Sequence, residues 1–437
     1  MKLDIFQSHK GDCLLLESKD GHRILCDGGM SAAMSRFVAP VLAKLRKAKK
    51  KIDIAYISHI DQDHISGVLR LLRDEVDWRV YEFQRAKGNP KAKKPENPRP
   101  PMIGGIWHNS FRGLQDDHDG KIQDLIASSV PALLATGAPD LREMGERLYG
   151  IATSIPEALE VSGLTGAGLL DIPVNRLPGS SGPARLLMSR PGQGAVKIGS
   201  LRLTIIGPGE EELSALRKGW DTWLGENGKR VDEINREVKR RMEEIGARAA
   251  GGPLLDLGDW NGVPDYKGVT IPNIASLMFM VEEAGKRVLL TGDSQQDMII
   301  RGLTTAGFLG PQGLHLDVLK VQHHGSENNL DEAFARQVSA DHYVFCGNGE
   351  HENPDLGVIR KVFASRLGAA SKRAIAPQAA GRPFTMWFSS TAALGPNSEN
   401  GRKHMVAVEK LVKDLRTQSN GSMRVQSSTK PFITLRV

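Results

Sequence analysis

Short apolar runs separated by turn residues make up the first part of the chain. The runs at 3–6, 13–16 and 23–26 are typical of strands joined by hairpins, and the third ends in Asp27-Gly28-Gly29. A helical pattern over 32–48 leads to another apolar run at 52–57, and apolar residues return at helical spacing after Gly67. This alternation of strands and helices predicts a layered α/β fold.

The rest of the chain continues the pattern with two interruptions. A helical insertion is expected at 121–200, and a charge-rich insertion with a helix at 231–245 is expected over about 210–250. We therefore expect the first half of a domain at 1–120, its second half at 201–365, and a C-terminal extension at 366–437. Further strands are predicted at 102–107, 201–206, 274–281, 287–290, 318–321, 342–346, 384–388 and 432–437, with a polar stretch containing Gly and Ser between the last two.

Composition indicates a globular protein. The 437 residues are 40% hydrophobic and 25% charged, which argues against disorder. Three cysteines are too few for a disulfide framework and fit a reducing compartment. The sequence shows neither a signal peptide nor an apolar run long enough to cross a bilayer, so we expect a cytoplasmic protein without a membrane partner.

The charge balance favours a polyanionic partner such as nucleic acid. The formal net charge is +7, and basic residues gather between 85 and 99 among several prolines. This segment could be a mobile cationic loop that contacts a polyanion, or a solvated insertion that only aids solubility. Its six basic residues are Arg85, Lys87, Lys91, Lys93, Lys94 and Arg99, against the single acid Glu96.

The segment 58–67, SHIDQDHISG, carries the clearest chemical signal. It places His59, Asp61, Asp63 and His64 within six positions, on a turn between a predicted strand and a predicted helix. Imidazole nitrogens and carboxylate oxygens gathered in this way can hold one or two divalent cations. The alternative is a polar turn with solvated aspartates, but turn chemistry does not require two histidines so close together.

Three later strands also end in reactive groups. Asp293 follows the strand 287–290, His323 and His324 follow 318–321, and His351 follows 342–346. Asp293 is the candidate bridge between two ions, His323 is the best later imidazole ligand, and His324 or His351 could complete a ligand set or contact substrate. A shallow site of this kind suits hydrolysis, because bound ions generate hydroxide near neutral pH and stabilise developing negative charge.

Together these segments resemble the metallo-β-lactamase-fold hydrolases, and within them the hydrolase domain of the competence protein ComEC. The resemblance implies an αββα sandwich with helical insertions and two divalent ions, zinc or manganese. It covers most of residues 1–365 but not the insertions or the last segment. The segments that carry it are 11–17 with 24–29, the turn 59–64, 273–281 with 291–293, 323–326, and the late His351.

The resemblance also implies roles for individual residues. One ion would bind His59 and Asp61, the other Asp63 and His64, with Asp293 as bridge and oxygen-rich ligands favouring manganese. The remaining implied roles are completion of the second ligand set by His323, support from a buried Asp27, and catalytic contributions from Asp63, His324 and His351.

The chain departs from the wider family at Gly207, which stands where a mid-chain histidine ligand is expected after the strand 201–206. His108 could replace that ligand from its own strand end or face the substrate; alternatively, one ion is loosely held. Ser326, Asn328 and Asn329 could donate hydrogen bonds to a substrate oxyanion, or they could cap their loop.

The function expected from these features is metal-dependent hydrolysis of phosphodiesters in DNA or RNA. A second hypothesis is hydrolysis of a small ester, lactone or nucleotide. A third, prompted by Gly207, is a non-catalytic binding or regulatory subunit of a defence or uptake system. ComEC-like proteins occur beside other enzymes in such systems, so a protein partner is also expected.

Overall fold

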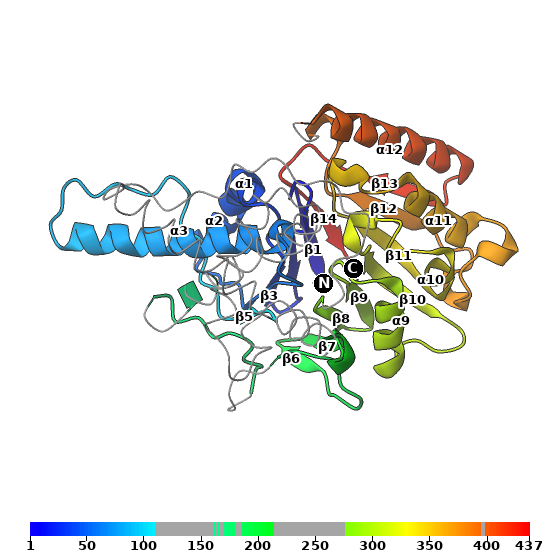
Figure 1. Ribbon diagram of the computed structural model, residues 1–437, viewed down its shortest axis with the longest axis horizontal. Coiled ribbons are helices and arrows are strands. Elements are labelled where there is room, and N and C mark those ends of the chain that lie inside the picture. The colour runs from blue at the N-terminus through cyan, green and yellow to red at the C-terminus, as the bar shows by residue number, and fades with distance from the viewer. Residues whose placement is uncertain (110–160, 162–163, 166–168, 180–185, 214–275, 395–397) are drawn as a thin grey trace, which may run out of the picture.

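Two β-sheets packed face to face form the centre of the protein, and helices cover both outer faces (Figure 1). The computed structural model describes residues 1–109, 161, 164–165, 169–179, 186–213, 276–394 and 398–437. Helices α1 to α3 lie beside the first sheet, and α9 to α12 lie beside the second. The αββα arrangement predicted from the sequence is therefore confirmed.

The first sheet has six strands in the order β14-β1-β2-β3-β4-β5. Strands β14 to β3 pair antiparallel, whereas β3, β4 and β5 pair parallel. Parallel pairing brings the carboxyl ends of β3, β4 and β5 to one edge. The strands are β1 (Lys2–Phe6), β2 (Leu14–Glu17), β3 (Arg23–Cys26), β4 (Ile54–Tyr56), β5 (Ile106–Trp107) and β14 (Phe432–Arg436).

The second sheet has eight strands in the order β13-β12-β11-β10-β9-β8-β7-β6. Pairing is antiparallel from β6 to β9 and parallel from β9 to β13, so β9, β10 and β11 also end at one edge. The strands are β6 (Val196–Ile198), β7 (Leu201–Gly207), β8 (Met278–Glu283), β9 (Lys286–Leu290), β10 (Leu314–Lys320), β11 (Val338–Phe345), β12 (Phe384–Phe388) and β13 (Met423–Gln426).

Aromatic side chains fill the space between the sheets close to this edge. Phe279 of the second sheet packs against Tyr56 and Trp107 of the first, with ring centroids 5.0 and 5.5 Å apart. The Tyr56 hydroxyl donates to the Leu277 carbonyl, and the Leu277 amide donates to the Ser58 carbonyl at 2.7 Å. The turn 58–64, which carries the candidate metal ligands and is called the ligand turn below, is thus hydrogen-bonded to the start of β8 in the second sheet.

The helix after the ligand turn begins earlier than the sequence pattern predicted. Helix α3 (Gln62–Ala86) starts before Gly67, because the amides of His64 and Ile65 already donate to the Asp61 carbonyl at 2.9 and 3.0 Å. Asp63 and His64 therefore lie on the first helical turn. The other helices are α1 (Ser31–Ala33), η1 (Met34–Val38), α2 (Ala39–Lys47), α9 (Gln296–Thr305), α10 (Glu332–Gln337), α11 (Leu356–Leu367) and α12 (Glu399–Gln418).

Residues 366–437, expected as an extension, contribute strands to both sheets. Strands β12 and β13 extend the second sheet, and β14 pairs with β1 in the first. Helix α12 stands where only a polar stretch was expected. Its buried apolar residues recur every three or four positions, as in an amphipathic helix, and Val408, Val412 and Leu415 belong to the core cluster of the second sheet. These buried residues are Met405, Val408, Val412 and Leu415.

The two predicted insertions cannot be compared with the structure in the same way. The helices expected within 121–161 and at 231–245 lie largely or wholly outside the described residues. Among the helices that the structure does describe, none combines the length and apolar character needed to cross a bilayer.

Candidate metal centre

The carboxylate of Asp293 lies at the meeting point of four imidazole rings. Its Oδ2 atom is 3.2 Å from Nε2 of both His64 and His324, 3.8 Å from Nε2 of His323, and 4.0 Å from Nε2 of His59. Asp293 follows β9, the pair His323 and His324 follows β10, and the other two rings follow β4. The edges at which the parallel strands of both sheets end therefore form one site.

The second nitrogen of each ring contacts a neighbouring oxygen. This leaves Nε2 to face Asp293, which is the arrangement in which histidines bind metals while an outer partner fixes ring orientation. The Nδ1 contacts are His59 to Ser58 Oγ at 3.0 Å, His64 to Asp27 Oδ2 at 3.0 Å, His323 to Asn329 Oδ1 at 2.7 Å, and His324 to Asp12 Oδ1 at 3.0 Å.

Several buried atoms at the site lack a hydrogen-bond partner within the described part of the chain. They are Nε2 of His59, His64 and His324, and Oδ1 of Asp293. Leaving such atoms unsatisfied costs free energy, so each calls for an explanation. Divalent cations would satisfy these nitrogens, and imidazole with carboxylate is a donor set that suits zinc or manganese. The residues present therefore fit a metal ion.

Two further carboxylates divide the site into two groups. Asp61 Oδ2 lies 3.4 Å from His59 Nε2. Asp63 lies beside the other rings, with Oδ2 3.3 Å from His324 Nε2 and Oδ1 4.0 Å from His64 Nε2. The structure thus brings together His59, Asp61, Asp63, His64, Asp293 and His323, but not His108, which was predicted as a possible ligand. It places His324 next to Asp63, whereas the sequence analysis assigned that second ligand set to His323; how the ions divide the ligands stays a prediction.

The charges of these groups strongly shift their pKa values. Burial by itself would raise the pKa of Asp293, but His324, His64 and His323 hold it well below its usual range. Burial would lower the pKa of His64 and His324, but nearby carboxylates, Asp293 foremost, raise both well above the usual value. These shifts favour protonated imidazoles when no cation is bound, so metal binding would displace protons.

Asp27 makes both contacts expected of a residue that supports the ligand turn. Its Oδ1 accepts a hydrogen bond from the Ser58 amide at 2.7 Å, and its Oδ2 contacts His64. The adjacent Gly28 allows this approach, since a Cβ there would lie 2.3 Å from the Val68 nitrogen in α3. The loop after β3 therefore packs directly against the helix that carries His64.

Two residues at the site were missed in the sequence analysis. Asp12, in the turn before β2, is one of four groups whose ligand-type atoms lie within 4.8 Å of one another, together with His64, Asp293 and His324. Lys320, the last residue of β10, contacts Asp12 and lies 3.5 Å from Asp293 Oδ1. Both are 2% exposed. Asp12 could have been found from the sequence, because it belongs to the segment 11–17 that carries the family resemblance. Lys320 could not, because an isolated lysine carries no sequence signal.

The remaining predicted histidines, His108 and His351, are not among the four closely spaced ligand-type groups. His108 is buried directly after β5, its ring nitrogens have no hydrogen-bond partner among the described residues, and burial lowers its pKa to about 4. His351 is exposed in the turn η5 (Glu350–Glu352) and is not one of the four closely spaced groups. Their roles as ligand or catalytic residue stay predictions.

The loop after His324 makes mainly internal contacts. The Ser326 amide donates to the His323 carbonyl at 2.8 Å, and Ser326 Oγ accepts from the Asn328 amide at 3.4 Å, which favours loop capping for these two residues. Asn329, which is fully buried, instead links the site: it contacts His323 Nδ1 and donates to the Asp293 carbonyl at 3.0 Å.

A family comparison agrees with this geometry. Residues 9–129 match the family described as the metallo-beta-lactamase superfamily. The fold is that of the metallo-β-lactamases. This fold is of the metal-dependent hydrolase type. The Asp/His cluster lies at the edge where the parallel strands of the two sheets end.

Solved structures give more distant likenesses. A mutant of CmlA beta-hydroxylase is 12% identical with a TM-score of 0.34, and the match covers 99% of this chain and 54% of that chain, so this chain spans about half the length of that protein. Zn²⁺-bound PqqB from Methylobacterium extorquens is 9% identical with a TM-score of 0.33, and the match covers 100% of both chains. Among curated proteins, no relative matches this chain.

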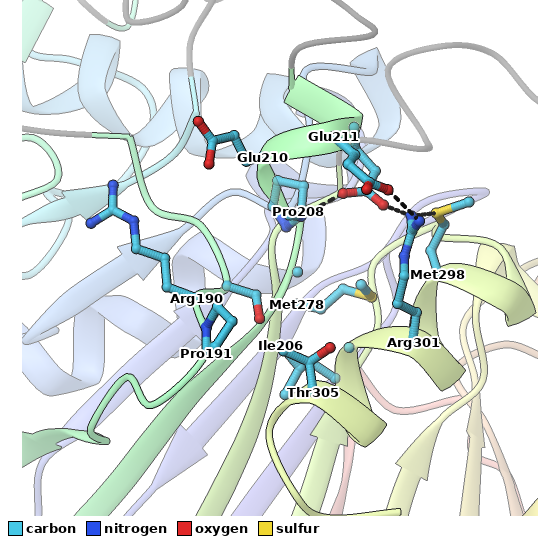
Figure 2. A pocket seen from close by; sticks show the side chains of 15 residues that line it. Arg190, Pro191, Ile206, Pro208, Glu210, Glu211, Met278, Met298, Arg301 and Thr305 are labelled. Carbon is cyan, nitrogen blue, oxygen red and sulfur yellow. Dashed lines mark hydrogen bonds and ion pairs between the residues drawn. The ribbon is translucent and has the colours of Figure 1, made fainter.

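Within this metallo-β-lactamase fold, Gly207 supplies no ligand. It ends β7, and a Cβ there would lie 2.1 Å from Met278 Cε. Gly207 lines a separate cavity of about 330 Å³ next to Pro208, shown in Figure 2, and none of the residues lining that cavity belongs to the metal centre. On one side of the cavity Arg301 pairs with Glu211 at 2.8 Å.

Proposed function

We propose that the protein is a metal-dependent phosphodiesterase of the ComEC-like type that acts on DNA or RNA. The observation that carries this proposal is the convergence of four Nε2 atoms on the Asp293 carboxylate, with Asp61 and Asp63 beside them. Divalent ions held by these groups would supply a hydroxide nucleophile near neutral pH and neutralise charge on the phosphoryl oxygens.

The exposure of the ligands indicates the side from which substrate approaches. The side chains of His59, His64 and Asp293 are at most 3% exposed, whereas those of Asp61 and His323 are 26% and 25% exposed. A substrate phosphate would therefore enter beside Asp61 and His323. The buried residues would keep the ligand geometry fixed while this side stays open.

Helix α3 supports a long polyanionic substrate. It begins at the metal ligands and runs outward from the sheets, as the long blue helix in Figure 1 shows. Its 25 residues span about 37 Å at 1.5 Å per residue. Beyond its end, the basic segment 87–94 is largely exposed. A nucleic acid lying along α3 could thus contact both the metal centre and the basic segment.

The tip of α3 combines cations with aromatic rings, which suits single-stranded nucleic acid. The Lys87 ammonium lies 5.7 Å from the ring centroid of Phe83, whose side chain is 64% exposed. The Lys94 ammonium lies 5.7 Å from the ring centroid of Trp78. The far end of the segment is anchored, because Arg99 pairs with Glu75 at 2.9 Å on α3. Such a surface offers charge to phosphates and rings to bases.

A nuclease panel tests the proposal. Wild-type protein with Mn²⁺ or Zn²⁺ should cleave a labelled single-stranded or duplex oligonucleotide, and Asp63→Ala should abolish cleavage. Hydrolysis of bis(p-nitrophenyl) phosphate without cleavage or binding of any oligonucleotide would instead indicate a small phosphodiester substrate. If no nucleic acid is cleaved with any metal, the proposal is contradicted.

Gly207 motivates the competing proposal of a binding or regulatory subunit, because the position lacks a side chain that could complete a ligand set. Metal stoichiometry separates the two proposals. About two tightly held ions per chain favour the enzyme, and weakly held or absent metal favours the non-catalytic subunit. A protein partner in a defence or uptake system belongs to this second proposal.

A further inference from the structure

We propose that Lys320 and Asp12 form a positioning pair that fixes Asp293 and His324 for a centre of two divalent ions. The inference rests on the proposed metal centre, but not on the identity of its substrate. Neither residue was assigned a role from the sequence, and both are almost completely buried. A lysine in such a position requires compensating charge, because burying an unpaired ammonium is costly.

Lys320 lies beside the Asp293 oxygen that does not face the imidazoles. Its ammonium donates to the Gly292 carbonyl at 2.9 Å, contacts Asp12 Oδ2, and lies 3.5 Å from Asp293 Oδ1. The other oxygen of Asp293, Oδ2, faces the four Nε2 atoms. The ammonium thus places its charge beside Oδ1, at ion-pair rather than hydrogen-bond distance, and Oδ2 is the oxygen that faces the imidazoles.

Asp12 connects this ammonium to His324. Its Oδ2 contacts Lys320, and its Oδ1 lies 3.0 Å from Nδ1 of His324. An acceptor at Nδ1 holds that proton and directs Nε2 towards Asp293 and Asp63. Although Asp12 is close enough to the cluster to bind an ion itself, both of its oxygens already have partners. We therefore assign it to positioning rather than to metal binding.

The turn that carries Asp12 is pressed against the ligand turn. A Cβ on Gly11 would lie 1.7 Å from the Asp63 carbonyl oxygen, so only glycine permits this approach. The Ser8 hydroxyl donates to the Gly11 carbonyl at 2.5 Å, and the Phe6 amide donates to the Cys13 carbonyl at 3.0 Å. The backbone thus holds Asp12 in place independently of its contact with Lys320.

The formal charges of the surrounding groups fit a centre of two divalent ions. Five carboxylates surround it, and Lys320 is the one ammonium that contacts them among the described residues. With neutral imidazoles this leaves a formal charge of −4, which two divalent ions neutralise. Lys320 therefore supplies the charge that two ions alone would not. The five carboxylates belong to Asp12, Asp27, Asp61, Asp63 and Asp293.

The alternative is that Lys320 and Asp12 only stabilise the fold, since buried ion pairs can often be replaced without loss of function. A test of metal binding separates the two possibilities. Asp12→Asn and Lys320→Met would be made in the full chain. Lys286→Met is the control, because Lys286 pairs with Asp317 at 2.8 Å in the same sheet and is not among the described residues that contact the centre.

The readouts are the dissociation constant for Mn²⁺ and Zn²⁺, measured by competition with a chromophoric chelator, and the absorption spectrum of the Co²⁺-loaded protein. We expect Asp12→Asn to weaken binding about 10- to 100-fold, the usual effect of removing an outer partner of a ligand. Lys320→Met should change the Co²⁺ spectrum, because Asp12 loses its ion-pair partner and the positive charge beside Asp293 Oδ1 disappears. Lys286→Met should leave both readouts unchanged.

Wild-type affinity and a wild-type Co²⁺ spectrum in both site variants would overturn the inference. If Lys320→Met does not fold, the affinity of the nearly isosteric Asp12→Asn decides. Activity is not a readout, so the outcomes remain distinct. Suppose that the protein binds metal and that Asp12→Asn lowers its metal affinity, but that it cleaves no nucleic acid. That result supports the positioning pair and contradicts the proposed function.

Discussion

His64 Nε2 lies 3.2 Å from Asp293 Oδ2, and this contact joins the two sheets of the sandwich. His64 follows β4 of the first sheet, and Asp293 follows β9 of the second. An ion bound between them would cross-link the sheets at the edge where their parallel strands end. Metal binding should therefore stabilise the whole fold as well as form the site.

This cross-link predicts that metal stabilisation grows with pH. The pKa values of His64 and His324 are raised in the folded metal-free protein. Their stabilising charge is therefore fully present below the unfolded value of about 6.5 and is lost as pH rises through the folded values. We expect the Tm of chelator-treated protein to fall as pH rises above about 6.5, while the metal-loaded protein changes less. Calorimetry with and without chelator measures both; a metal-free Tm that rises over this range would contradict the assignment.

Replacing Asp27 tests the support of His64. Asp27→Asn removes the charge that contacts His64 Nδ1 at 3.0 Å, so metal affinity should fall about 10- to 100-fold. Asp341→Asn is the control, because Asp341 makes an equivalent contact to His315 Nε2 at 3.0 Å, away from the centre. Isothermal titration with Mn²⁺ compares the two variants. Equal affinities in both would mean that Asp27 does not orient the ligand.

Gly11 tests the close approach of the Asp12 turn to Asp63. Gly11→Ala places a methyl group 1.7 Å from the Asp63 carbonyl, and relief of this overlap should cost about 1–3 kcal/mol of folding free energy and displace Asp63. Gly194→Ala is the control, since a Cβ there meets no atom within 4 Å. Urea denaturation and metal titration give the two readouts. A Gly11→Ala protein as stable as the control would show that the approach is looser than described.

The basic segment beyond α3 predicts a separable effect on nucleic acid. The triple variant Lys87→Glu, Lys91→Glu and Lys94→Glu should weaken oligonucleotide binding and reduce the salt dependence of log K by about 0.7–0.9 per lost phosphate contact. Hydrolysis of bis(p-nitrophenyl) phosphate should not change. The control reverses Lys403, Lys410 and Lys413, which are exposed on α12. Fluorescence anisotropy at several salt concentrations compares the oligonucleotide affinities of the two triple variants. Equal losses of affinity in both would argue against a binding role for the basic segment at the end of α3.

The sequence predicted the site better than it predicted the surroundings of the site. Ligands such as His59 and Asp293 carry their own chemical signal at strand ends, so their convergence followed from the order of strands. Lys320 gave no such signal, because its role depends on Asp12, which is more than 300 positions away in the chain. Contacts between the two sheets depend on packing and strand register, which local residue patterns do not predict.

The last part of the chain shows a different reason for error. The spacing of Met405, Val408, Val412 and Leu415 is helical, but the surrounding charge and the glycine at 401 obscured it. Strand β14 pairs with β1, although the two strands lie at opposite ends of the sequence. The apolar run 432–437 predicts a strand but does not indicate which strand it pairs with. The segment therefore looked like an extension although it completes both sheets.

Elemental analysis of the purified protein tests the central claim most directly. After equilibration with Mn²⁺ or Zn²⁺ and removal of free metal, the wild type should retain about two ions per chain, and Asp293→Ala should retain far less, because it loses the oxygen that faces all four imidazoles. A wild type that retains no metal, or an Asp293→Ala protein that still holds two ions, would contradict the account.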